Sequence, residues 1–209
     1  MQYQEIVDLL NAIKAKTSKQ KNLSLEEVLI QLDHLGTSFI ALFLVLPFMQ
    51  PFPVGPISVI GGLAFSFIGL NIFQNKKKLV LPKKILQIKF SPSNWNRLFN
   101  LCLLTMKVTN KITKKRPLLF FSNAILAKKI EGAILIISGF LMAIPFGILP
   151  FNNFFPGLAI LFIILAQFKH DGLFVFFSIF WVLFTIIYFA LFFYGIYSLG
   201  NHFMQVFTF

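Results

Sequence analysis

The run from Ile144 to Ala159, IPFGILPFNNFFPGLA, restricts the fold more than any other stretch of the chain. It sets three prolines and two adjacent asparagines inside a long apolar segment. Proline removes a backbone N–H donor and breaks the helical hydrogen-bond ladder, so this segment cannot be one straight helix. Backbone groups freed at bilayer depth must be covered by protein or water, because lipid offers no hydrogen bonds. We therefore expect a covered break here, and breaks of this kind are candidates for function.

A second segment of this type, LPFMQPFPVGPI, runs from Leu46 to Ile57. The pair predicts two proline-broken helical hairpins, at residues 36–75 and 130–171, arranged as an internal repeat. Transport folds are often built from repeats around broken helices, with the ligand site where the breaks meet. The arm from Gly36 to Leu46 reaches only ~16 Å at 1.5 Å per residue, about half a bilayer. Re-entrant hairpins fit these lengths, and tilted, kinked spans are the alternative.

The composition and the placement of charge indicate an all-α, polytopic integral membrane protein. Hydrophobic residues make up 57% of the chain and charged residues only 12%, whereas soluble domains carry about 25% charged residues. Of the 19 Lys and Arg residues, fourteen fall between Lys76 and Lys129, and none follows Gly172. The positive-inside rule puts such basic regions on the cytoplasmic face, where anionic lipid head groups are the expected partner. Nucleic acid is not expected as a partner, because no binding module accompanies the net charge of +12.

The remaining segments frame the two hairpins. Residues 1–35 predict two cytosolic amphipathic helices, the second beginning at a capping box of Ser24 and Glu27. Residues 76–129 form a basic linker that includes an interfacial amphipathic helix from Ser91 to Lys115. Residues 172–209 hold a transmembrane helix, the uncharged run from Leu173 to Leu199, and a short tail on the far side.

The predicted ligand site lies at the two proline-rich breaks, Leu46–Ile57 and Ile144–Ala159, which we call the first and second elbows. Proline is favoured in the first helical turn, so Pro56 and Pro156 mark helix starts whose free amides, near Ser58 and Gly157, would attract an anion. Side-chain hydrogen bonds would come from Gln50, Ser58, Asn152 and Asn153. In the alternative interpretation, Asn152 and Asn153 only satisfy the broken backbone.

Two charged residues outside the elbows complete the candidate set. Asp171 stands before the last helix and is expected to cap its amides more than to carry protons. Arg116 is either a binder of lipid phosphate or an ordinary surface residue.

No catalytic motif accompanies these residues, so an enzyme is not expected. Cys102 is the single cysteine, and the histidines fall on opposite faces, so neither a metal site nor any other cofactor is predicted. Association into a homo-oligomer is compatible with the sequence.

Several motifs resemble the ExoD family of bacterial membrane proteins associated with exopolysaccharide synthesis. They are Leu35-Gly36, PFPVGPIS ending at Ser58, the basic run from Lys76 to Pro82, Arg116-Pro117, PFNNFFPGLAIL from Pro150 to Leu161, and Asp171-Gly172. The chain departs from the family pattern at Asn71 and at Lys169-His170. The resemblance implies a location in the bacterial inner membrane and a link to surface polysaccharide production, and it implies no reaction.

Two functional hypotheses follow from the pattern and the resemblance. In the first, the elbows bind or translocate an anionic lipid, such as a lipid-linked saccharide or its polyprenyl-phosphate-type carrier. In the second, the protein is a non-transporting scaffold or regulator of polysaccharide-synthesising enzymes. Broken helices favour the first hypothesis, because a scaffold does not need them.

Overall fold

The computed structural model describes residues 3–19, 23–32, 37–49, 55–76, 83–112, 124–145, 149–169 and 171–207, and it is all-helical, as predicted. The helices are α1 (Tyr3–Lys19), α2 (Leu25–Leu32), α3 (Thr37–Val45) with the 3-10 turn η2 (Leu46–Phe48), α4 (Pro56–Phe73), α5 (Lys83–Leu86), α6 (Pro92–Ile112), α7 (Ala124–Ala143), α8 (Phe154–Lys169) and α9 (Gly172–Phe207). Two short strands, β1 (Leu23–Ser24) and β2 (Lys89–Phe90), pair antiparallel and tie the N-terminal segment to the linker. Helix α7 begins at Ala124, ahead of the hairpin boundary expected at residue 130.

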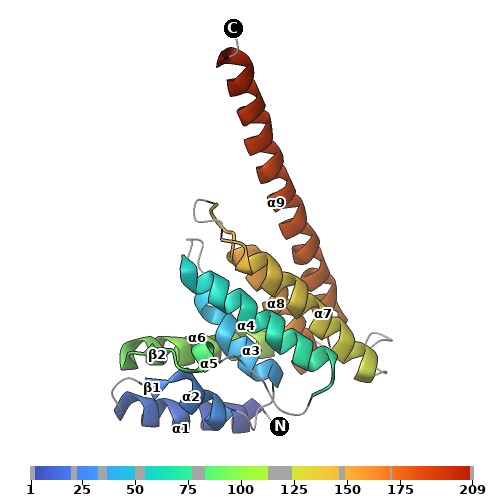
Figure 1. Cartoon of the computed structure of the whole chain (residues 1–209). Coiled ribbons are helices and arrows are strands. Elements are labelled where there is room, and N and C mark those ends of the chain that lie inside the picture. Colours follow the sequence, from blue (N-terminus) through green and yellow to red (C-terminus); the bar gives the residue numbers. More distant parts are fainter. Residues whose placement is uncertain are drawn as a thin grey trace.

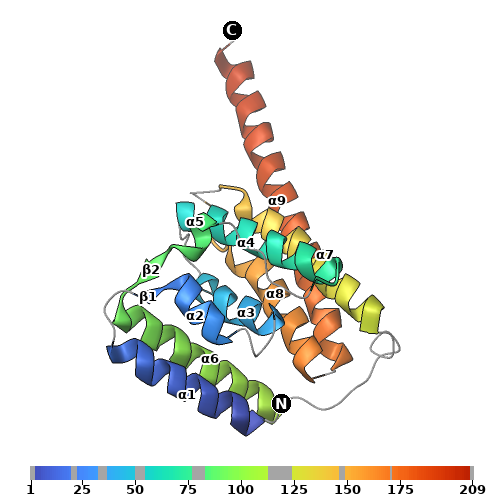
Figure 2. The ribbon, with the colours of Figure 1, turned by 60° about the horizontal axis from the view of Figure 1, so that its bottom comes forward.

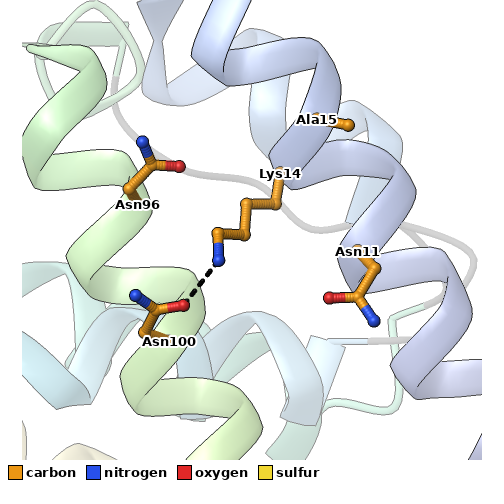
Figure 3. A pocket seen from close by; sticks show the side chains of 5 residues that line it. All are labelled: Asn11, Lys14, Ala15, Asn96 and Asn100. Carbon is orange, nitrogen blue, oxygen red and sulfur yellow. Dashed lines mark hydrogen bonds between the residues drawn. The ribbon is translucent and has the colours of Figure 1, made fainter.

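The N-terminal helices form a layer at the base of the molecule (Figure 1). Helices α1 and α6 lie side by side in this layer (Figure 2), and Lys14 Nζ donates to Asn100 Oδ1 across them at 2.6 Å (Figure 3). The predicted capping box of α2 is confirmed, because Glu27 Oε2 accepts from the Ser24 amide at 2.8 Å and from the Ser24 hydroxyl at 2.9 Å. These bonds lower the pKa of the Glu27 carboxyl.

Helix α6 is amphipathic as expected, but protein covers part of the face that the sequence assigned to lipid. Trp95, Phe99 and Cys102 are fully buried, and Phe43 of α3 packs against Trp95 and Phe99 with ring centroids 5.8 and 5.1 Å away. Leu104 and Val108, on another side of the helix, stay exposed. The predicted apolar face is therefore wide enough to be shared between the core of the protein and the outer surface.

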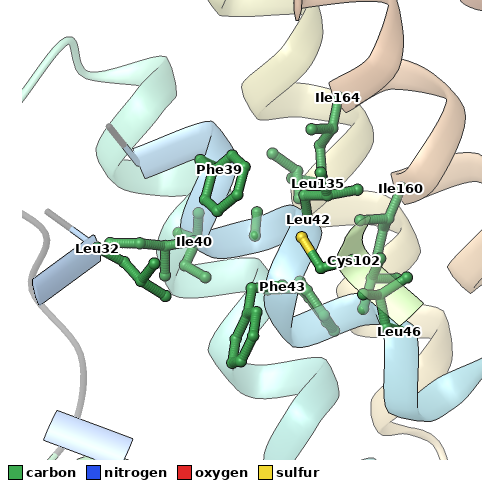
Figure 4. Close-up of a cluster of buried hydrophobic side chains, with 14 of the residues drawn as sticks. Leu32, Phe39, Ile40, Leu42, Phe43, Leu46, Cys102, Leu135, Ile160 and Ile164 are labelled. Carbon is green, nitrogen blue, oxygen red and sulfur yellow. The ribbon is translucent and has the colours of Figure 1, made fainter. Parts of the chain in front are cut away.

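Helix α3 is the centre of the core. Its sequence, TSFIALFLV, is apolar on nearly every side, as expected for a helix surrounded by other helices. Six of its nine residues are buried, from Phe39 to Phe43 and Val45. Side chains from α2, α6, α7 and α8 surround it in Figure 4, among them Leu32, Cys102, Leu135 and Ile164.

Glycines allow α4 and α7 to pack at backbone contact. Gly62 faces Gly139 and Gly69 faces Gly132, so the two helices run antiparallel. The glycines of each helix are seven positions apart, about two turns, and therefore lie on the same face. A Cβ added at Gly62 would lie 2.4 Å from the Gly139 carbonyl oxygen, and one at Gly139 would lie 2.6 Å from the Gly62 oxygen. Gly62 and Gly69 thus let α4 approach α7 closely, as small residues do in the packing of membrane helices.

The pairing of the helices crosses between the two hairpins. Helix α4 packs far more on α7 than on α3, and α3 packs on α8, so each arm of one hairpin meets an arm of the other. Helix α9 packs along α8 and then projects beyond the bundle (Figure 1). Among the described residues, two helices are long and apolar enough to cross a membrane, Pro56–Phe73 and Gly172–Ser198. The most apolar 18 residues of each are 44% and 28% buried within the protein.

Candidate functional site

Both apolar runs are broken where the prolines predict. The first arm ends at Phe48 and α4 begins at Pro56, after Gly55 with φ of 65°. The second arm ends at Ala143 and α8 begins at Phe154, after a turn in which Phe151 has φ of 58°. A positive φ costs little free energy at Gly55 and more at the bulky Phe151. Both residues mark positions where the chain turns between helices.

The two elbows meet inside the protein. A Cβ added at Gly157, in the first turn of α8, would lie 2.3 Å from Met49 Cε at the end of the first arm and 3.8 Å from Met142 Cε on α7. The missing side chain of Gly157 therefore leaves the space that Met49 fills. This contact joins the first elbow to the second.

Asn152 and Asn153 are buried just before α8, with 3% and 0% of their surface exposed. The Oδ1 and Nδ2 atoms of Asn153 have no hydrogen-bond partner in the part of the chain that the structure describes. Leaving such a buried group unsatisfied costs roughly 1–3 kcal/mol. In the alternative interpretation, the Asn153 side chain only hydrogen-bonds backbone groups freed by the break. No hydrogen bond among the described residues supports that alternative.

The expected free amides at Ser58 and Gly157 are not free, and this prediction was wrong for both. Helix α8 starts at Phe154, ahead of Pro156, so the Gly157 amide already bonds the Asn153 carbonyl oxygen at 3.0 Å. The Ser58 amide and hydroxyl both bond the Gly55 carbonyl oxygen, at 3.0 and 2.7 Å. The candidate site therefore depends on the side chains of Asn152 and Asn153 and on the N-terminal end of α8. Ser58 makes its hydrogen bonds within the first turn of its own helix, α4.

Aromatic side chains fasten the second elbow to α9. Phe155 stacks on Trp181 with ring centroids 5.6 Å apart, and it meets Tyr188 edge to face at 5.1 Å. Tyr188 also donates from its hydroxyl to the Pro150 carbonyl oxygen at 2.9 Å. These contacts hold the second elbow beside Tyr188 of α9.

Asp171 caps α9, as the sequence predicted. Its Oδ1 accepts from the Leu173 amide at 3.1 Å, and its carbonyl oxygen accepts from the Phe174 amide at 3.2 Å. Gln50 and Arg116, the other two candidates, lie outside the described residues.

Glu131 is a buried acid that the sequence analysis did not single out. It lies at the charged end of α7, outside the two helices that can span a membrane, with 3% of its surface exposed. The Ser38 hydroxyl of α3 donates to its Oε1 at 2.5 Å. Burial raises the pKa of Glu131 to about 7, against the opposing effects of Ser38 and Lys128. The signal available in the sequence was an acid directly before the uncharged run that begins at Gly132.

Chemical groups for metal binding do not gather in the described parts of the chain. No three His, Cys, Asp or Glu residues there lie close enough to hold a metal ion. Burial raises the pKa of the Cys102 thiol to about 12.

The apolar helices and the broken bundle indicate a membrane protein with an all-helical fold. The sequence comparisons give its family. The family model described as "Exopolysaccharide synthesis, ExoD" matches residues 6–191, so the chain belongs to the ExoD family. Protein ExoD of Rhizobium meliloti (strain 1021) is 27% identical over 179 residues, which cover 86% of this chain and 74% of the relative. No solved structure matches the chain significantly. Membership in this family implies involvement in exopolysaccharide synthesis.

Proposed function

We propose that this protein binds an anionic lipid or lipid-linked saccharide of the polyprenyl-phosphate type where its elbows meet, and that it moves this ligand across the membrane. The observation that carries the proposal is the fully buried Asn153 carboxamide, which has no hydrogen-bond partner among the described residues. A buried polar group in this state calls for an explanation, and a ligand that hydrogen-bonds it is one. The family gives the process, exopolysaccharide synthesis, in which such lipids would be handled.

The chemistry at the elbow suits a negatively charged group. Asn153 directly precedes α8, so a ligand on its side chain would lie at the N-terminal end of this sixteen-residue helix. The Asn153 Nδ2 group can donate to a phosphate oxygen, while its Oδ1 can accept from a hydroxyl. The aromatic and methionine side chains around the elbow would pack against an apolar chain.

The position of the elbow along α9 supports a re-entrant arrangement. Tyr188 holds the elbow, and it lies ~24 Å from Gly172 at 1.5 Å per residue. The apolar part of α9 continues to Ser198, ~15 Å further along the helix. In this arrangement the elbow lies within the depth that α9 spans and does not emerge beyond it.

The proposed orientation follows from the charges at the other end of the bundle. Lys128 Nζ donates to Asn75 Oδ1 at 2.7 Å there, far along α7 and α4 from the elbows. We assign this end to the cytoplasmic face of the bacterial inner membrane, together with the N-terminus, and the C-terminus to the periplasmic side. The exposed apolar stripe of α4 would then face lipid; its residues are Ile57, Ile60, Leu63, Phe67, Leu70 and Phe73.

The test compares two buried asparagines that differ in their hydrogen bonds. Asn153→Leu removes an unpartnered amide, so we expect the melting temperature of the purified protein to hold or rise. The same variant should lose transport of a fluorescent polyprenyl phosphate in reconstituted vesicles. Asn71→Leu is the matched control, because Asn71 Nδ2 bonds the Phe67 carbonyl oxygen at 2.7 Å, and this variant should lower the melting temperature.

Two outcomes would remove the proposal. The first is unchanged flux in Asn153→Leu and in the double variant Asn152→Ala/Asn153→Ala. The second is a fall in melting temperature in Asn153→Leu as large as in the control. Unchanged flux, together with loss of a co-purifying enzyme when basic residues at 76–129 are neutralised, would instead support a scaffold.

A further inference from the structure

A polar groove runs between α1 and α6, away from the elbows. It has a volume of about 470 Å³ and is lined by Asn11, Lys14, Ala15, Asn96 and Asn100. Asn11 and Lys14 are three residues apart on α1, and Asn96 and Asn100 are four apart on α6, so each pair shares one helix face. Figure 3 shows the four polar side chains converging from the two helices.

The groove lies between two helices that pack side by side and bury apolar residues in the core. The buried residues include Leu10 and Ile13 of α1 and Phe99 and Met106 of α6. Ala15 adds only a methyl group to the lining, which keeps the hollow open. Packing therefore holds the two helix faces at a fixed spacing, as a preformed binding site requires.

The lining combines three carboxamides with one ammonium group and contains no carboxylate. Each carboxamide offers an acceptor and two donors, which is the complement of neighbouring sugar hydroxyls. Lys14 Nζ uses one donor on Asn100 Oδ1 and keeps two for an anion. The Asn96 Oδ1 atom is buried and has no hydrogen-bond partner among the described residues, so it can accept from a ligand hydroxyl.

We propose that this groove binds a phosphorylated saccharide, with the ring hydroxyls on the asparagines and the phosphate on Lys14. A volume of about 470 Å³ lies within the range of small-molecule sites, ~300–1,000 Å³, and accommodates a hexose phosphate. The groove is a second site on different helices from the elbows. Its ligand can be a free sugar phosphate or a phospholipid head group that carries a polyhydroxylated ring on its phosphate.

Binding is measured on the full-length protein in nanodiscs of zwitterionic lipid, with glucose 1-phosphate as the probe. We expect saturable binding by calorimetry, with glucose and inorganic phosphate each at least tenfold weaker. Lys14→Met should remove the preference for glucose 1-phosphate over glucose, and Asn96→Ala should weaken both sugars about tenfold. Phosphatidylinositol in the nanodiscs competes with the probe if the site also accepts a lipid head group, and leaves binding unchanged if it takes only the free sugar.

The controls lie on the same helices outside the groove. Lys16→Met on α1 and Asn94→Ala on α6 change exposed residues and should leave the affinity unchanged. Asn153→Leu should also leave it unchanged, which separates this inference from the proposed function at the elbow. If the wild-type protein shows no saturable binding, or if the control variants weaken binding as much as Lys14→Met, the groove is not a saccharide site. If Asn96→Ala fails to fold, the comparison of Lys14→Met with Lys16→Met still decides.

Discussion

Replacing Glu131 with glutamine should make the protein more stable at neutral pH and leave its stability unchanged in acid. Glu131 is buried in α7 and accepts a hydrogen bond from the Ser38 hydroxyl at 2.5 Å. Glutamine keeps an oxygen that can accept this bond, and it carries no charge at any pH. The substitution therefore isolates the cost of ionising a carboxyl in the core.

The size of the effect follows from the pKa of Glu131, which burial raises from 4.5 to about 7. Below pH 4.5 the Glu131 carboxyl is protonated in the folded and unfolded states, so it does not make the free energy of unfolding depend on pH. As the pH rises to 7, the unfolded chain releases this proton while the folded protein retains it, and folding stability falls by about 3 kcal/mol. Above pH 7 both states are ionised, and the loss remains constant.

Thermal unfolding in detergent, followed by tryptophan fluorescence from pH 4 to pH 8, measures this difference. For a chain of 209 residues, about 3 kcal/mol corresponds to a gain of roughly 6–12 °C in Glu131→Gln at pH 8. Glu26→Gln, at an exposed position on α2, is the control and should show no such trend. A Glu131→Gln difference that is the same at pH 4 and pH 8 would refute the reasoning.

Three further predictions concern packing, capping and thiol reactivity. Gly62→Val should abolish folding of the α4–α7 pair, because its side chain would meet the backbone of Gly139; the fraction of monodisperse protein on gel filtration measures this, and normal recovery would contradict the packing. Because its pKa is lowered, Glu27 should stabilise α2 above pH 4.5 and lose this effect as the pH falls, so Glu27→Gln should lower the melting temperature at pH 7 but not in acid. Cys102 should not react with maleimide until the protein unfolds, since the thiol is buried and its pKa is about 12; rapid labelling of the folded protein would show that α6 packs differently.

Local signals in the sequence were sufficient for both breaks and for the starts of α2 and α9. The prolines marked both breaks, Ser24 and Glu27 marked the start of α2, and Asp171 marked the start of α9. Each of these signals acts within a few residues, so its physical cause is visible in the chain itself.

Contacts between distant segments could not be predicted in the same way. Nothing local in the sequence shows that Gly62 faces Gly139 and does not face α3. Glu131 is an acid directly before an uncharged run, and nothing local in the sequence shows that it is buried and bonded by Ser38 of α3. The free amides were misjudged because α8 begins at Phe154, two residues before the proline that was taken as its start.

The claim that matters most is that the second elbow stays within the membrane, and labelling of single cysteines from the far side tests it most directly. Phe151→Cys at the elbow and Gly200→Cys near the end of α9 are made in a Cys102→Ser background. Both are exposed to a membrane-impermeant maleimide on the periplasmic side of intact cells. We predict that Gly200→Cys is labelled and Phe151→Cys is not, whereas equal rates for the two would mean that the elbow emerges on the far face.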